Sequence, residues 1–173
     1  RMSHAGVDSV ALVMQNNYHS LMEHVGSGKE WDLSRKRGGI AFFPPYSSAG
    51  SIGYSRGTLE SMAGILSYLQ ASNADYFAVS DCDVLCGVDL SDVLEYHIAH
   101  DAGITLICTD TGHGKVMVTP DENGRLQEAT RGGEGAWMFT NMYIINRQLL
   151  IQLVTEAASL NQYSFVDTCL IQK

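Results

Sequence analysis

Short runs of apolar residues alternate along this chain with stretches in which apolar residues recur every three or four positions. Runs of about four to eight residues are typical of buried strands, whereas the wider spacing is typical of a helix with one buried face. The pattern predicts strands at residues 10–14, 40–43, 76–79, 104–108, 115–118, 125–129 and 137–145, and helices at residues 18–24, 58–69, 91–100, 147–158 and 165–173.

Most of these strands and helices follow one another in alternation, which is the arrangement of an α/β protein. The strands at residues 115–118 and 125–129 are separated by the turn-forming sequence PDENG at residues 120–124, which predicts a hairpin added to the sheet. The expected fold class is therefore α/β and Rossmann-like. Its sheet is expected to be doubly wound and mixed, with mostly parallel strands and helices on both faces.

The composition fits one globular domain of 173 residues, of which 45% are hydrophobic. The formal net charge is −8, and the acidic residues are dispersed, so a nucleic-acid-binding role is disfavoured. No apolar run approaches the length of a membrane span, and the first residues lack the apolar core of a signal peptide, so we expect a cytoplasmic protein. The four cysteines form no C-x-x-C pair, which favours neither a disulfide framework nor a zinc site.

Two carboxylates follow one of the predicted strands. Asp81 and Asp83 come directly after the apolar run at residues 76–79, and a helix is predicted soon afterwards. Ligands bind at the carboxyl ends of strands in open α/β sheets, and acidic side chains there can hold Mg²⁺ together with substrate phosphates. Aspartate also favours turns and helix N-caps on its own account. The segment alone therefore leaves a Mg²⁺–phosphate site and an Asp-rich turn equally open.

A second candidate site is cationic. Lys29, Arg35, Lys36 and Arg37 lie within nine residues of one another, flanked by glycines. The Gly-Lys pair suggests a P-loop, but Glu30 stands where that motif requires Ser or Thr. In an acidic chain such a cluster suits a phosphorylated effector or the acidic face of a partner subunit. A solvated loop is the alternative.

The start of the helix predicted at residues 58–69 is a third candidate site. Arg56, Gly57 and Thr58 place free backbone N–H groups where a phosphate or a polar base edge can bind, although Thr58 is also a good N-cap. His97 and His100 lie three positions apart on another predicted helix. Without a third ligand, we expect these two histidines to be a surface pair rather than a metal site.

These motifs, taken in order, resemble the nucleotidyltransferase domain of bacterial glucose-1-phosphate adenylyltransferase, also called ADP-glucose pyrophosphorylase. The longest match, HVGSGKEWDLSRKRGG at residues 24–39 with PPY at residues 44–46, is similar to the signature of the GlgD-type subunit. The sequence RGT at residues 56–58 is similar to the family's helix-opening motif near the nucleotide. Asp83 falls at the position of the family's metal-binding catalytic aspartate, with Asp89 at the matching spacing. The likeness runs through essentially the whole chain.

The resemblance implies a GT-A-like nucleotidyltransferase fold and transfer of AMP from ATP to glucose 1-phosphate, with release of pyrophosphate. It implies Mg²⁺ at Asp83 and Asp81, nucleotide contacts from Arg56, Gly57 and Thr58, and a catalytic homologous subunit as the partner. Positioning and charge neutralisation supply most of the catalysis in a reaction of this kind.

Departures from the family pattern favour a regulatory or weakly catalytic subunit. The family's Gly-rich pyrophosphate loop is expected before the first residue and its β-helix domain after the last, so residues 1–173 are expected to be a partial, inactive domain. The family's Glu-Lys-Pro motif is replaced by ATRGGEG at residues 129–135, and Phe139 stands where relatives carry a serine. The expected function is that of a GlgD-like subunit in glycogen biosynthesis. A fully catalytic sugar-nucleotide pyrophosphorylase and a non-catalytic nucleotide or sugar-phosphate sensor are the alternatives.

Overall fold

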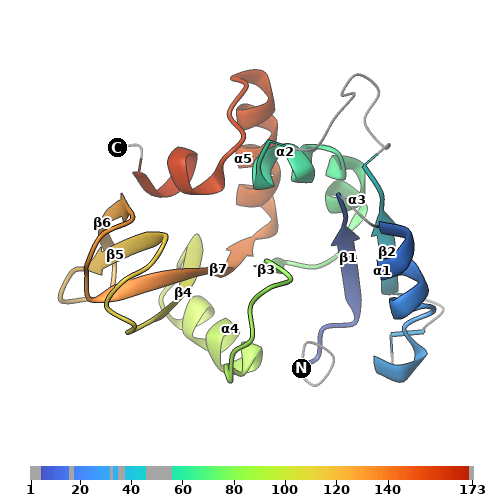
Figure 1. The fold of residues 1–173 in the computed structure, drawn as a ribbon, viewed down its shortest axis with the longest axis horizontal. Coiled ribbons are helices and arrows are strands. Elements are labelled where there is room, and N and C mark those ends of the chain that lie inside the picture. The colour runs from blue at the N-terminus through green and yellow to red at the C-terminus, as the bar shows by residue number, and fades with distance from the viewer. Residues whose placement is uncertain (1–4, 16–17, 32, 35–37, 46–55, 172–173) are drawn as a thin grey trace.

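The structure is a computed structural model that describes residues 5–15, 18–31, 33–34, 38–45 and 56–171 (Figure 1). In chain order its elements are β1 (Ser9–Val13), α1 (Tyr18–Val25), the 3-10 helix η1 (Lys29–Trp31), β2 (Gly39–Phe43), α2 (Thr58–Ala63), α3 (Leu66–Ala71), β3 (Tyr76–Ser80), α4 (Leu90–Ala99), β4 (Ile104–Thr109), β5 (Val116–Pro120), β6 (Leu126–Arg131), β7 (Trp137–Asn146), α5 (Arg147–Ser159) and the π-helix η2 (Val166–Ile171). Each predicted strand and helix has a counterpart among them.

The helix predicted at residues 58–69 is divided into α2 and α3. Ile65 leaves the helical conformation, with φ −116° and ψ 17°, and its N–H group bonds to the carbonyl oxygen of Met62 in a tightened turn. The apolar face continues across this turn, because Leu59, Met62, Ile65 and Leu69 are all buried. The apolar spacing therefore predicted the buried face correctly and missed the turn.

β7, with ten residues, is the central strand of a five-stranded sheet (Figure 1). Along one edge of β7, residues 142–146 pair with β3 and residues 137–138 pair with β5. β4 pairs with the opposite edge, and β6 pairs with β5 as the predicted hairpin. β1 and β2 form a separate parallel pair.

The α/β class and the mixed strand directions are confirmed, but neighbouring strands are less often parallel than the alternation suggested. β1 and β2 are parallel, whereas the pairings described within the five-stranded sheet are antiparallel. β3 and β4 are joined through α4 and run in the same direction, as in a β-α-β unit. They do not pair with each other because β7 lies between them, antiparallel to both.

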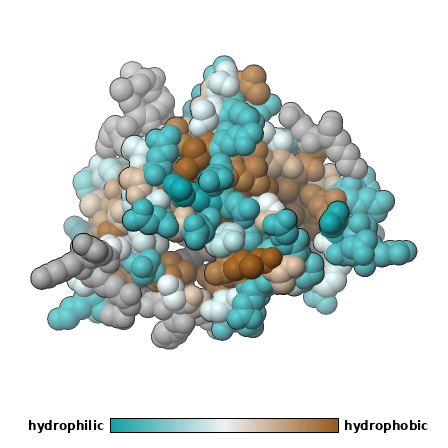
Figure 2. Space-filling view, turned by 180° about the vertical axis from the view of Figure 1, so that it is seen from behind, coloured by the Kyte–Doolittle hydropathy of each residue, from teal (hydrophilic) through white to brown (hydrophobic). Residues whose placement is uncertain are grey.

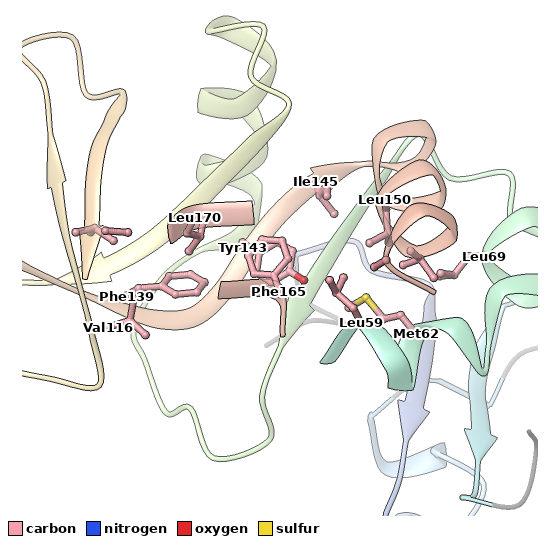
Figure 3. Packing of buried hydrophobic residues seen from close by; sticks show 14 of the residues in the cluster. Leu59, Met62, Leu69, Val116, Phe139, Tyr143, Ile145, Leu150, Phe165 and Leu170 are labelled. Atoms are coloured by element: carbon pink, nitrogen blue, oxygen red, sulfur yellow. The ribbon is translucent and has the colours of Figure 1, made fainter. Parts of the chain in front are cut away.

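Helices cover both faces of this sheet, as predicted. Successive side chains of a strand point to opposite faces. Tyr143 and Ile145 of β7 belong to the large core cluster that includes residues of α2, α3 and α5 (Figure 3). Met142, the residue directly before Tyr143, points to the other face and packs against Leu90 at the start of α4 and Ile107 of β4.

None of the helices in the described part of the chain has both the length and the apolar character that a bilayer crossing requires.

Candidate functional site

The carboxyl end of β3 lies at a point where β7 changes its neighbour. Ser80, the last residue of β3, pairs with Met142, and the next strand on the same edge of β7 is β5, which pairs with residues 137–138. Residues 139–141 of β7 therefore lie between the two strands on this edge. Asp81 leaves β3 at this interval, which we call the β3–β5 notch.

A β-bulge in β7 forms one side of the notch. On the opposite edge, Ile107 pairs with Met142 and Cys108 with Phe139, so Thr140 and Asn141 are extra residues of β7. Bulges of this kind bend a strand and re-aim its side chains. Asn141 adopts the left-handed conformation, with φ 58°, which asparagine tolerates better than most residues. The Thr140 hydroxyl donates a 2.6 Å hydrogen bond to the carbonyl oxygen of Ile107.

The bulge brings the Asn141 side chain to the first predicted metal ligand. Asn141 Nδ2 donates a 3.0 Å hydrogen bond to Asp81 Oδ2, across sixty residues of sequence. Asp81 and Asp83 are both exposed, and Asp83 lies in a turn of the loop that leads to α4. At the end of this loop Asp89 is the N-cap of α4, where its side chain accepts a 2.9 Å hydrogen bond from Ser91 N.

The carboxylates at the notch suit Mg²⁺ in the chemistry of their atoms. Within the described ranges no group of three His, Cys, Asp or Glu side chains converges as a complete metal centre. Mg²⁺ does not need one, because it keeps several waters and is commonly held by one or two carboxylates together with substrate phosphates. Asp81 and Asp83 supply oxygen ligands of this kind, so the residues present fit the ion.

A buried hydroxyl lies beside the notch. The Tyr143 side chain is 2% exposed, and its hydroxyl has no hydrogen-bond partner among the residues that the structure describes. Burial raises the pKa of Tyr143 far above its ordinary value, with smaller contributions from Cys169 and from the negative charge of Asp81. The Tyr143 ring stacks on Phe165, with ring centroids 4.2 Å apart (Figure 3). The Tyr143 hydroxyl is therefore a buried group inside the core between β7 and η2.

The predicted nucleotide motif at the start of α2 makes contacts within the protein. The Arg56 backbone N–H donates to the Glu60 carboxylate, and the Arg56 guanidinium pairs with the same carboxylate at 2.8 Å. The guanidinium carbon also lies 3.6 Å from the centroid of the Tyr163 ring. The hydrogen bond to Glu60 is the main cause of a raised pKa for Arg56. Arg56 would have to leave these partners to contact a nucleotide.

Gly57 is required by close packing. Its backbone is extended, with φ 173°, so the requirement does not come from an unusual backbone conformation. A Cβ atom added at Gly57 would lie 2.3 Å from the carbonyl oxygen of Tyr163. That oxygen also accepts a 3.0 Å hydrogen bond from Leu59 N. The start of α2 is thus held against the segment that leads into η2.

The same segment holds the hairpin of β5 and β6. Arg131 of β6 donates to both carboxylate oxygens of Asp167, each at 2.7 Å, and to the hydroxyl of Ser164 at 3.2 Å. The hydrogen bond from Arg131, and after it one with the side chain of Ser164, lowers the pKa of Asp167. Residues 163–167 therefore contact the predicted nucleotide motif on one side and the hairpin on the other. Tyr163, Arg131 and Asp167 were not among the site residues predicted from the sequence.

The predicted site residues fall into three groups. Asp81 leaves β3 at the notch, where it accepts the hydrogen bond from Asn141, and Asp83 follows in the loop that leads to α4. Arg56, Gly57 and Thr58 open α2. Of the cationic cluster, Lys29 is exposed in η1, whereas Arg35, Lys36 and Arg37 lie outside the described residues.

The prediction of a surface pair of histidines was wrong for His97. Its side chain is 1% exposed, with Nδ1 2.8 Å from Thr105 Oγ1 and Nε2 2.6 Å from Asn146 Oδ1. A buried imidazole is stable when both ring nitrogens are hydrogen-bonded. Its two partners lie on β4 and β7, so the spacing within α4 gave no sign of them. His100 is exposed, as expected, and stacks on Tyr96.

The fold is that of the nucleotidyltransferase-like α/β proteins. Two crystal structures of HddC from Yersinia pseudotuberculosis, one of them complexed with GMP-PN, match the chain with a TM-score of 0.63. Each match covers 87% of this chain and 61% of the HddC chain, at 16% sequence identity for the complex and 14% for the other structure. At these identities the likeness concerns the fold alone. No family model matches the sequence.

The sequence has curated relatives that match most of its length. The glycogen biosynthesis protein GlgD of Geobacillus stearothermophilus is 30% identical over 166 residues, which are 96% of this chain. The glucose-1-phosphate adenylyltransferases of Geobacillus stearothermophilus and Bacillus subtilis are 29% and 28% identical over 157 and 172 residues. Over most of its length the chain is thus related in sequence to the glucose-1-phosphate adenylyltransferases and to GlgD. It spans between 41% and 45% of the length of these relatives.

Proposed function

We propose that the chain is part of a GlgD-like subunit of glucose-1-phosphate adenylyltransferase, acting in the cytoplasm in glycogen biosynthesis. The family reaction joins ATP and glucose 1-phosphate to form ADP-glucose and pyrophosphate. The observation that carries the proposal is the acidic notch: Asp81 and Asp83 lie at the carboxyl end of β3, where an α/β sheet binds its ligands. The relatives matched over nearly the whole chain support the choice of reaction.

In this proposal Asp81 and Asp83 hold Mg²⁺ and Arg56, Gly57 and Thr58 lie near the nucleotide. Bound Mg²⁺ would neutralise charge on the phosphates during the in-line displacement at the α-phosphorus. Arg56 would exchange its internal partners, Glu60 and Tyr163, for the nucleotide. Since the guanidinium of Arg56 is exposed, this exchange needs no opening of the core.

Two features favour a regulatory or weakly catalytic role over full activity. Phe139, at the position of the family's serine, is 4% exposed and packs near Tyr143 and Phe165, so it offers a sugar no hydrogen bond. The segment that replaces the family's Glu-Lys-Pro motif places Arg131 in an ion pair with Asp167. We therefore propose that a homologous catalytic subunit is the partner, and that Lys29, with Arg35, Lys36 and Arg37, binds that subunit or a phosphorylated effector.

The test compares the full-length protein with its Asp83→Asn variant, each alone and mixed with a homologous catalytic subunit. Pyrophosphate release from Mg²⁺, ATP and glucose 1-phosphate is measured together with the mass of the assembly. The proposal predicts little release from the protein alone, and a mixed assembly whose rate or effector response differs from that of the catalytic subunit.

Strong release by the protein alone, abolished in the Asp83→Asn variant, would indicate a fully catalytic pyrophosphorylase instead. Nucleotide or sugar-phosphate binding without assembly or release would indicate a sensor. Either result would contradict the proposed role.

A further inference from the structure

We infer that Asn141 is a positioning residue: the bulge of β7 aims its side-chain amide at Asp81 and so fixes that carboxylate for a divalent cation and its phosphates. The inference rests on the proposed function of the notch. It concerns a contact between two segments sixty residues apart in the sequence.

The strand pairing explains why Asn141 can reach Asp81. The β3 ladder ends at the pair of Ser80 and Met142, and the next residue on each strand is Asp81 or Asn141. Asn141 does not continue the ladder, because its φ of 58° turns the backbone away from the strand conformation. Its side chain instead spans the end of the ladder and bonds to the Asp81 carboxylate at 3.0 Å.

Another residue contributes to the shape of the bulge. The hydroxyl of Thr140 bonds to the carbonyl oxygen of Ile107 at 2.6 Å, on the edge of β7 that faces β4. Phe139 and Met142, on either side of the two extra residues, are buried at 4% and 8% exposure. These contacts hold the strand without the Asn141 amide. The amide can therefore be removed by mutation while the bulge is kept.

The chemistry of the contact suits a metal ligand. An amide donor is neutral, so Asp81 keeps its full negative charge for a cation while one of its oxygens is held in place. The carboxylate of Asp167 differs, because both of its oxygens are paired with the positively charged guanidinium of Arg131. Removing a group that orients a ligating carboxylate commonly lowers the metal affinity by about tenfold or more.

The test measures binding of Mn²⁺, used alone as a probe, to the full-length protein by the loss of the free-ion signal in electron paramagnetic resonance. The variant is Asn141→Gly, because glycine adopts the left-handed conformation freely and has no side chain that could donate to Asp81. We expect its dissociation constant for Mn²⁺ to rise about tenfold. The thermal unfolding midpoint should stay close to that of the unchanged protein.

Asn161→Gly is the matched control. Asn161 is also an asparagine with positive φ, 52°, but it lies beyond the end of α5, in the segment before Phe165. Its replacement should leave the Mn²⁺ affinity unchanged. Asp81→Ala should weaken binding by itself, and adding Asn141→Gly to it should cause no further loss, because the amide acts only through that carboxylate.

Three results would overturn the inference. Unchanged Mn²⁺ affinity in Asn141→Gly, with clear binding by the unchanged protein, would refute the positioning role and leave the proposed site standing. A further loss on adding Asn141→Gly to Asp81→Ala would show that Asn141 acts by another route. No Mn²⁺ binding by the unchanged protein up to millimolar concentrations would contradict the metal site of the proposed function, and the inference with it.

Discussion

Replacing Gly57 with alanine tests whether the start of α2 is held by backbone packing. The added Cβ would lie 2.3 Å from the carbonyl oxygen of Tyr163 and 2.7 Å from its carbon, whereas ordinary contact begins at 3.4 Å. Both of these atoms are backbone atoms and cannot rotate away like the end of a side chain. The segment at Tyr163 must therefore move, and the hydrogen bond that Leu59 N donates to its oxygen must lengthen or break.

The expected cost follows from these two effects. Forcing extra atoms into a packed site typically costs about 1–3 kcal/mol. Loss of one hydrogen bond beside Leu59, which is 1% exposed, adds roughly 0.5–1.5 kcal/mol. We expect Gly57→Ala to lower the free energy of unfolding by about 2–4 kcal/mol. Backbone strain adds nothing, because φ at Gly57 is 173°.

The assay is urea unfolding followed by circular dichroism, with the midpoint and slope compared between variants. Gly103→Ala is the matched control, because its Cβ would meet only the Cδ2 atom of Leu149, at 3.0 Å, and that side chain can adjust. The control should lose less than about 1 kcal/mol. A loss below about 0.5 kcal/mol in Gly57→Ala would refute the packing argument.

Three further outcomes are expected. Because hydrogen bonds lower the pKa of Asp167, its pair with Arg131 should stabilise the protein above the ordinary pKa of aspartate and lose that effect as the pH falls below about 4. Asp167→Asn should therefore lower the free energy of unfolding by at most about 1 kcal/mol at pH 7 and by nothing measurable near pH 2. An equal loss at both pH values would contradict this. Leu150→Ala, at a side chain 1% exposed, should cost about 2–5 kcal/mol in urea unfolding, and a loss under about 1 kcal/mol would show that the core is loosely packed there. Burial raises the pKa of the Cys108 thiol to about 11, so at pH 8 a thiol reagent should modify exposed Cys82 well before Cys108. Equal rates of modification at the two cysteines would contradict the burial of Cys108.

Elements whose signals are local were predictable from the sequence. The hairpin of β5 and β6 follows from two short apolar runs around a PDENG turn, and the structure pairs these strands with the turn at Asp121–Gly124. The helices α4 and α5 follow from apolar spacing. The neighbours of each strand were not predictable in the same way. β7 follows the hairpin in the sequence, and yet it lies between β3 and β4 in the sheet.

The geometry of the candidate site depends on contacts between distant segments. The apolar run at residues 76–79 locates Asp81 at the end of a strand, but it does not show that Asn141 will contact it. An asparagine inside a predicted strand is the one local hint of a bulge there, since asparagine is depleted in strands and tolerates positive φ. His97 was misjudged for the same reason, because its partners Thr105 and Asn146 belong to other elements.

A crystal structure of the full-length protein, grown with Mn²⁺ and a non-hydrolysable ATP analogue, would test the proposed metal site at the notch, with anomalous diffraction used to locate the metal. We expect an anomalous peak at the notch, at coordination distance from the carboxylates of Asp81 and Asp83, with the nucleotide phosphates on the same side of the sheet as the start of α2. A metal peak elsewhere, or a nucleotide bound away from the carboxyl end of β3, would contradict this expectation.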